Sequence, residues 1–183
     1  MVKYDSSGKF LSEWSSPKGF FGPRGVALAD NGDVYVTDTG NKRVQVFDKD
    51  GRFLRFWGAE GNGPGQFIEP VGITVRGGQV YVCDTGNQRV QVFSTAGRQL
   101  FEFVPYGWGG NAVGVEPHLS VDSRGNIYLT DSFKGYLEVF SPEGDPIQKY
   151  FGGLSRPSGI EVSGNRGAVS ELGSSSVKIF SIE

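Results

Sequence analysis

The chain has 183 residues, and its 18 Lys and Arg against 20 Asp and Glu give a formal net charge of −2. This balance disfavours a surface built to neutralise nucleic-acid phosphates, and no run approaches the roughly 18 apolar residues of a membrane helix. One cysteine excludes an internal disulfide framework, while 29 glycines favour short strands joined by tight turns.

The N-terminal segment carries no apolar core of the kind that signal peptides have, so we expect a soluble chain without an export signal; the compartment stays open. Lys9-Phe10-Leu11 reads as a strand. Before it, Val2-Lys3-Tyr4-Asp5 resembles the end of a strand seen later, at Val46-Phe47-Asp48, so the chain begins in mid-unit. Either the chain is a fragment of a larger ring, or this stub is left unused.

The next stretch predicts four antiparallel strands in close succession. Residues 25–28 are apolar, and Asp-Asn-Gly-Asp then supplies the tight turn of a hairpin. The second, third and fourth strands are expected at 34–37, 43–47 and 52–57. Four strands in about 45 residues is the size of a propeller blade.

This unit recurs through the chain. Its opening prolines, Pro23, Pro70, Pro117 and Pro157, stand 47, 47 and 40 residues apart. A period of this size marks an array of like units, none of which can bury its apolar face alone. Binding on a shared surface is the usual role of such arrays.

The sequence therefore predicts an all-β fold, a β-propeller of about four four-stranded blades in one domain over residues 1–183. The repeats are expected at 15–58, 59–104, 105–151 and 152–183, with an N-terminal strand at 8–14. The last repeat stops after its third strand. We expect the N-terminal strand to supply the fourth and close the ring; oligomerisation is the alternative.

The string Asp-Thr-Gly-Asn-x-Arg-Val-Gln-Val-Phe occurs at 38–47 and again at 84–93, downstream of Pro-x-Gly-Val or Pro-x-Gly-Ile. This pattern resembles the NHL repeat, whereas no Trp-Asp dipeptide of the WD40 type is present. The third repeat departs from it at Lys134 and Tyr136, and the fourth keeps only the outline. The resemblance implies recognition of protein or RNA, usually on six blades; related six-bladed propellers include metal-using lyases and lactonases.

Two features of the repeat are interpreted as structural. Asp38 with Arg43, and Asp84 with Arg89, are expected to form charge-assisted hydrogen bonds that staple each turn. Cys83 aligns with threonine or serine in the other repeats, which indicates a small structural side chain and not a nucleophile, because no histidine aligns with it.

A ring of polar residues is expected where the repeat-opening prolines meet at the mouth of the central channel. It brings Glu69, Glu116 and the single histidine, His118, opposite Arg24 and Arg156. Two carboxylates and one imidazole suggest a metal site or a small polar pocket, whereas mutual ion pairs on a hydrated rim are the structural alternative.

Two long loops, 57–67 and 104–113, place aromatic residues on glycine-rich backbone at the same rim. Exposed aromatics with adaptable polar neighbours are typical of binding surfaces, although Trp57 and Phe67 could instead pack onto the blade edges. The predicted rim binding residues are Arg24, Trp57, Glu60, Phe67, Glu69, Tyr106, Trp108, Glu116, His118 and Arg156.

The leading functional hypothesis is a non-catalytic scaffold that binds a protein or peptide on this rim, with no cofactor. A metal-dependent hydrolase or lyase centred on Glu69, Glu116 and His118 is the alternative, and RNA binding is a weaker one. An unclosed array would expose apolar blade faces and associate with itself through blade edges. A propeller module, cut from a larger ring or engineered, without independent activity remains a further alternative.

Overall fold

The computed structural model describes residues 1–106, 108, 116–132, 134–150 and 153–182. Five antiparallel sheets follow one another around a common axis, in the manner of propeller blades, and no strand crosses between them. Part of the second long loop, residues 107 and 109–113, lies outside the described residues. The predicted fold class, an all-β propeller array of four blades, is confirmed.

Blades 1 and 2 are complete meanders of four strands. Blade 1 contains β3 (Pro23–Leu28), β4 (Val34–Asp38), β5 (Arg43–Phe47) and β6 (Phe53–Trp57), and blade 2 contains β7 (Pro70–Arg76), β8 (Gln79–Asp84), β9 (Arg89–Ser94) and β10 (Gln99–Phe103). A single 3₁₀ turn joins the second strand to the third: η1 (Thr39–Asn41) and η2 (Thr85–Asn87). Each turn ends in a left-handed residue, Lys42 or Gln88.

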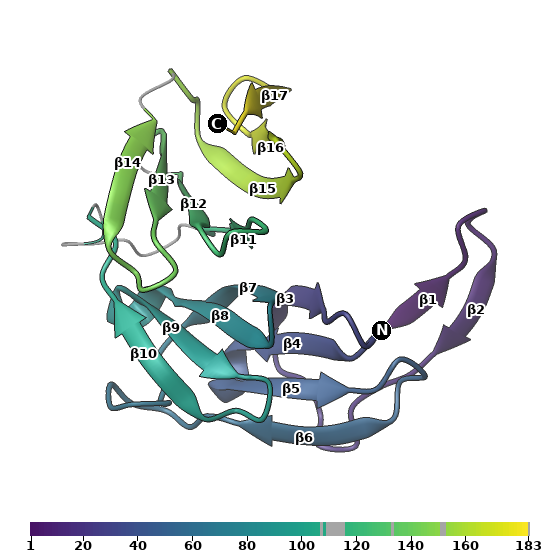
Figure 1. Ribbon diagram of the computed structural model, residues 1–183. Coiled ribbons are helices and arrows are strands. Elements are labelled where there is room, and N and C mark those ends of the chain that lie inside the picture. The colour runs from purple at the N-terminus through teal and green to yellow at the C-terminus, as the bar shows by residue number, and fades with distance from the viewer. Residues whose placement is uncertain (107, 109–115, 133, 151–152, 183) are drawn as a thin grey trace.

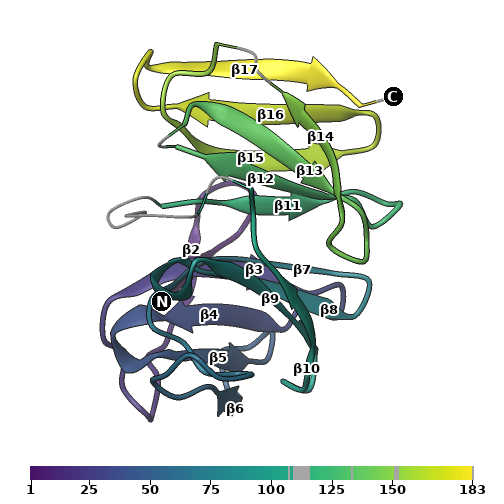
Figure 2. The same cartoon turned by 90° about the vertical axis from the view of Figure 1, so that its left-hand side faces the viewer.

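Blade 3 is again four-stranded, whereas blade 4 stops after three strands. Blade 3 contains β11 (Leu119–Val121), β12 (Ile127–Asp131), β13 (Tyr136–Phe140) and β14 (Pro146–Tyr150), and blade 4 contains β15 (Pro157–Ser163), β16 (Arg166–Glu171) and β17 (Ser176–Ser181). Figure 2 shows β17 at the outer margin of its sheet.

The core consists of apolar layers between successive blades. Val44 and Val46 of blade 1 pack with Ile73, Val80 and Phe93 of blade 2. A similar layer lies between blades 2 and 3, and another between blades 3 and 4. Because each blade needs its neighbour to bury these residues, the layers hold the array together.

The N-terminal segment forms a half-blade, which corrects one prediction. The strand expected to close the ring is β2 (Phe10–Glu13), and it pairs with β1 (Val2–Tyr4) to form a separate two-stranded sheet. Within the described part of the chain, β17 pairs with β16 alone. The closure prediction is therefore wrong. A short hairpin loop costs much less entropy than a closure that spans the whole chain.

The half-blade docks on blade 1 as one ordinary blade docks on the next. The ring of Trp14 packs where a Cβ on Gly51 would stand, as Trp57 does over Gly97 and Phe103 over Gly144. Met1 and Trp14 join a cluster with Val34, Val36 and Phe47 of blade 1. In Figure 1 this half-blade and blade 4 stand at the two ends of the array.

Candidate functional site: the rim of the opening prolines

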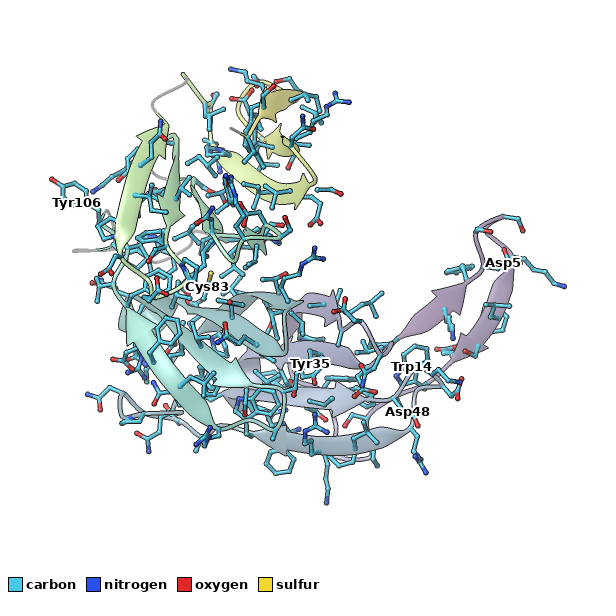
Figure 3. The ribbon with its side chains drawn as sticks, in the orientation of Figure 1. Asp5, Trp14, Tyr35, Asp48, Cys83 and Tyr106 are labelled. Carbon is cyan, nitrogen blue, oxygen red and sulfur yellow. The ribbon has the colours of Figure 1, made fainter. Side chains whose placement is uncertain are left out.

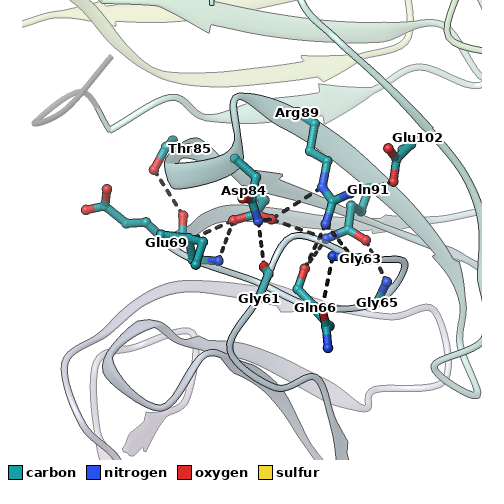
Figure 4. Close-up of polar contacts among 12 residues, drawn as sticks. Gly61, Gly63, Gly65, Gln66, Glu69, Asp84, Thr85, Arg89, Gln91 and Glu102 are labelled. Carbon is teal, nitrogen blue, oxygen red and sulfur yellow. Dashed lines mark hydrogen bonds and ion pairs between the residues drawn. The ribbon is translucent and has the colours of Figure 1, made fainter. Parts of the chain in front are cut away.

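The rim is formed by the loops that precede each blade's first strand and by the turns that join its second strand to its third. In blade 2 the centre of this region is the buried carboxylate of Asp84 (Figure 4). It accepts the backbone N–H groups of Ile68 at 3.0 Å and Glu69 at 3.1 Å, and it accepts the side-chain amide of Asn87 at 2.7 Å. Asp84 therefore ties the loop before β7 to the turn after β8.

The same network fixes the first long loop. Arg89 lies 3.5 Å from Asp84 and donates to the carbonyls of Gly63 at 2.8 Å and Gln66 at 3.0 Å. Gln91 donates to the carbonyl of Gln66 at 2.8 Å and accepts the N–H of Gly65 at 3.0 Å. Buried polar side chains of blade 2 thus hold a glycine-rich segment in one conformation.

Blade 1 repeats this arrangement with a closer ion pair. Arg43 Nε lies 2.8 Å from a carboxylate oxygen of Asp38. Burial opposes ionisation of Asp38, but hydrogen bonds from Phe21, Asn41, Arg43 and Gln45 outweigh it and lower the pKa of that carboxyl. The structure thus contains both predicted Asp–Arg pairs.

Sequence reasoning missed the two glutamines of these networks. Gln45 and Gln91 are fully buried, and each donates to the aspartate of its blade. The signal was the repeated Val-Gln-Val triplet, since a polar residue inside a buried strand needs a buried partner.

Part of the predicted polar ring assembles on the surface. Arg24 pairs with Glu69 at 2.7 Å and lies 4.0 Å from Glu116, so it bridges the rims of blades 1, 2 and 3. The left-handed Arg156 is exposed in the corresponding loop of blade 4, and its backbone carbonyl accepts the N–H of Leu172. Mutual ion pairs thus account for Arg24, Glu69 and Glu116, as the structural alternative predicted.

His118 lies in the wall of a central groove. Burial lowers the pKa of His118, and nearby Glu116 opposes this shift. Among the described residues, no three His, Cys, Asp or Glu side chains gather so that they could hold a metal ion. The runner-up metal grouping of Glu69, Glu116 and His118 is therefore not formed.

The predicted rim aromatics separate into buried and exposed sets. Phe67 and Trp108 lie in the apolar layers between blades 1 and 2 and between blades 2 and 3, and Trp57 packs on Phe93, so the expectation of exposed surface at Phe67 and Trp108 is wrong. These side chains lie inside because each inter-blade layer needs apolar residues to fill it. Tyr106, in contrast, is 75% exposed and points outwards (Figure 3).

Phe21 is a rim residue that the sequence analysis did not select. It is 69% exposed, and its ring lies where a Cβ on Gly40 would stand. Ile68 occupies the equivalent place over Gly86 in blade 2. The usable signal was position: each of these residues stands two places before the opening proline. Glu60 is exposed near this surface and forms an isolated bridge with Phe67.

Cys83 lies inside the array, and its thiol is fully buried (Figure 3). Burial raises the pKa of this thiol well above its usual value, and Asp84 adds to the effect, so the reactive thiolate is disfavoured. The equivalent Thr37 donates to the carbonyl of Val71 in the next blade at 2.6 Å. The side chain at this position therefore contacts the next blade and has a structural role.

The inner side of the array encloses a groove of about 950 Å³. Its walls come from the first strands of all four blades and from the half-blade; they include Val26, Leu28, Arg76, His118, Glu161 and Tyr4. No helix within the described ranges is long and apolar enough to cross a membrane.

Stacked four-stranded meanders joined by apolar layers define the class: the protein is a β-propeller array. The NHL repeat model matches residues 20–47 and 67–93, so the chain carries two NHL repeats, in blades 1 and 2. The resemblance on which the sequence analysis relied is confirmed there.

Curated relatives share short segments with this chain. RING finger protein nhl-1 of Caenorhabditis elegans is 37% identical over 83 residues, which is 38% of this chain and 8% of that protein. Protein brain tumor of Drosophila melanogaster is 41% identical over 56 residues, or 31% of this chain and 5% of that protein. The chain thus spans less than a tenth of the length of these relatives.

Solved structures share the fold at low sequence identity. A streptogramin B lyase structure superposes over 99% of this chain and 61% of its own, with a TM-score of 0.65 and 16% identity. The computationally designed Ika4 protein covers 94% of this chain and 99% of its own, with a TM-score of 0.63 and 16% identity. At these identities the likeness shows the fold alone.

Proposed function

We propose that this protein is a non-catalytic scaffold that binds a protein or peptide on the rim. The observation that carries the proposal is that the rim loops expose two aromatic rings, Phe21 and Tyr106, and that the rim also carries the ion cluster of Arg24, Glu69 and Glu116. Large aromatic rings near an arginine are the anchors that binding surfaces use most often.

The rigidity of the rim supports this proposal. Buried carboxylates and glutamines hold the loops of blades 1 and 2 in place before any partner arrives, which lowers the entropy lost on binding. The NHL repeats lie in the same two blades. For the alternative enzyme, the described residues offer no grouping of three metal-ligating side chains.

The test is selection of peptides from a phage-displayed random library on the full chain, followed by titration calorimetry of the selected peptides. Phe21→Ala and Arg24→Ala should each weaken binding by roughly tenfold or more. Arg98→Ala is the matched control, because Arg98 is exposed in the β9–β10 turn, at the opposite end of its strand from the rim. Unchanged affinity in both rim variants, or failure to select any peptide, would overturn the proposal.

A further inference from the structure

The two ends of the array are incomplete in complementary ways. The half-blade consists of strands equivalent to the third and fourth of a blade, and blade 4 consists of a first, second and third strand. Each end leaves apolar residues uncovered. In the other blades the equivalent residues are buried by a neighbouring blade.

At the N-terminal end the uncovered residues lie on β3. Val26 pairs with Val36 just as Ile73 of blade 2 pairs with Val82, so the two positions are equivalent. Val26 is 63% exposed, whereas Ile73 is 7% exposed. The cause is the half-blade, which has no first or second strand to cover Val26 and its neighbour Leu28.

At the C-terminal end the uncovered residues lie on β17. Val177 is 64% exposed, while the equivalent Val44 of blade 1 is fully buried against blade 2. Ile179 is similarly exposed. In addition, the outer edge of β17 carries no fourth strand, although β6, β10 and β14 pair with the third strands of their blades.

The chain itself contains a strand that fits this edge. Tyr4 pairs with Phe10 across a bulged register, and Phe47 pairs with Phe53 across the same bulge, so β2 is equivalent to β6. By the same equivalence, β1 and β17 are both third strands. A β2 strand placed on β17 would set Phe10 opposite Phe180 and Glu13 opposite Lys178.

We infer that a second copy of this chain completes the array: β2 of one copy leaves β1 and pairs with β17 of the other. The three-stranded blade 4 then becomes four-stranded, and its β15 and β16 cover Val26 and Leu28 of the partner. Glu13 against Lys178 adds a cross-strand pair of opposite charge. β2 exchanges β1, a strand of three residues, for the six-residue β17, which is already held in a sheet.

Two copies can make this contact twice. Both incomplete ends of one array border the same open sector (Figure 1). In the proposed dimer the second array lies in that sector and engages both ends, so each copy donates one β2 strand and accepts one. A head-to-tail interface that closes in this way gives a discrete symmetric dimer and not a filament. Burial of four exposed aliphatic side chains in each contact provides the driving force.

The first experiment measures mass by light scattering over a range of chain concentrations. The proposal expects a transition from 19.8 kDa to twice that mass as the concentration rises. Ile179→Asp should lower the association constant by roughly tenfold or more, since it places a charge in the apolar contact. Circular dichroism should show its fold unchanged, because Ile179 is exposed in the single chain. A single-chain mass at every concentration, or growth beyond two copies, would overturn the proposal.

The second experiment fixes the register with cysteines, in a Cys83→Ser background. Chains carrying Glu13→Cys, mixed with chains carrying Lys178→Cys, should form a two-chain disulfide on oxidation, because opposed residues lie within bonding distance. Leu11→Cys is the control, since Leu11 occupies the bulge and has no partner in this register. Equal cross-linking of the control contradicts the exchange. A chain that carries both Glu13→Cys and Lys178→Cys and forms the disulfide only within itself would also contradict the exchange.

Discussion

Blades 1 and 4 both fix the loop before the first strand to the end of the second strand, but they do so with different side chains. In both, a carboxylate at the end of the second strand accepts a backbone N–H from the loop before the first strand: Phe21 N–H for Asp38 at 2.7 Å, and Ser155 N–H for Glu171 at 2.5 Å. Arg43 and Gln45 complete the site in blade 1. In blade 4 Ser176 and Lys178 stand in their places. The hydroxyls of Ser174 and Ser176 donate to Glu171, and Lys178 lies 3.5 Å from it.

Blade 3 lies between these extremes. Asp131 keeps its place and accepts the N–H of Lys134 at 2.8 Å, while Tyr136 and Glu138 stand where Arg89 and Gln91 stand in blade 2. Glu138 accepts the N–H of Tyr106, just as Gln91 accepts that of Gly65, so it also holds the loop that precedes its blade. All four blades thus place a carboxylate at this point, whereas its cationic and amide partners vary.

The largest expected effect comes from removal of the acceptor in blade 2. Asp84→Ala should cost about 3–5 kcal/mol of unfolding free energy, because it leaves the N–H groups of Ile68 and Glu69 and the amide of Asn87 without their acceptor and removes one of the two carboxylates that pair with the buried Arg89. Glu171→Ala in blade 4 should cost clearly less, since Lys178 can turn to water. Urea denaturation of both variants measures the difference. Equal losses would show that the arginine is irrelevant.

The second-largest effect is the cost of a glycine-to-alanine substitution, which should be larger in an inner blade than in the terminal blade. A Cβ on Gly72 would stand 2.3 Å from the carbonyl oxygen of Pro117 in blade 3, whereas a Cβ on Gly159 meets only Ser170 Oγ, at 3.0 Å. Gly72→Ala should therefore cost about 1–3 kcal/mol by forcing blades 2 and 3 apart. Gly159→Ala should be nearly neutral. Thermal unfolding of both variants, at a concentration where the chain is monomeric, measures the two losses. A larger loss for Gly159→Ala than for Gly72→Ala would contradict this packing.

A smaller effect, of opposite sign, is expected at Cys83. Thr37 and Thr130 donate to carbonyls of the next blade at 2.6 and 2.7 Å, and the thiol of Cys83 can offer only a weak donor there. Cys83→Thr should raise the unfolding free energy by about 0.5–1.5 kcal/mol. Cys83→Val, which lacks a hydroxyl, is the control and should bring no such gain. The measurement is urea denaturation of the three chains.

A further effect appears only in acid. Hydrogen bonds from the Ser155 N–H and the Ser176 hydroxyl lower the pKa of Glu171 to about 2, from an ordinary value of 4.5. Because the folded value is the lower one, this stabilisation is complete above pH 4.5 and is lost as the pH falls towards 2. Circular dichroism during urea titration at several pH values should show the loss. In the Glu171→Gln variant, the unfolding free energy should depend less steeply on pH between 4.5 and 2.

The strands and turns were predictable because period-two alternation and Asn-Gly or Asp-Gly turns are local signals. The Asp–Arg pairs were predictable for the same reason, since the two residues lie five positions apart on a single turn. The burial of Phe67 and Trp108 was not predictable, because a glycine-rich loop gives no sign of which way its aromatic ring turns. The pairing of β2 with β1 was missed because a full-length closure and a local hairpin compete for the same strand.

The three tryptophans each sit at a different joint of the array. Trp14 lies between the half-blade and blade 1, Trp57 between blades 1 and 2, and Trp108 between blades 2 and 3. Indole emission shifts to longer wavelength when the ring meets water. In a chain that keeps one tryptophan and carries phenylalanine at the other two places, the emission wavelength therefore reports on one interface alone. Three such chains, unfolded in parallel, would show the order in which the interfaces between blades separate.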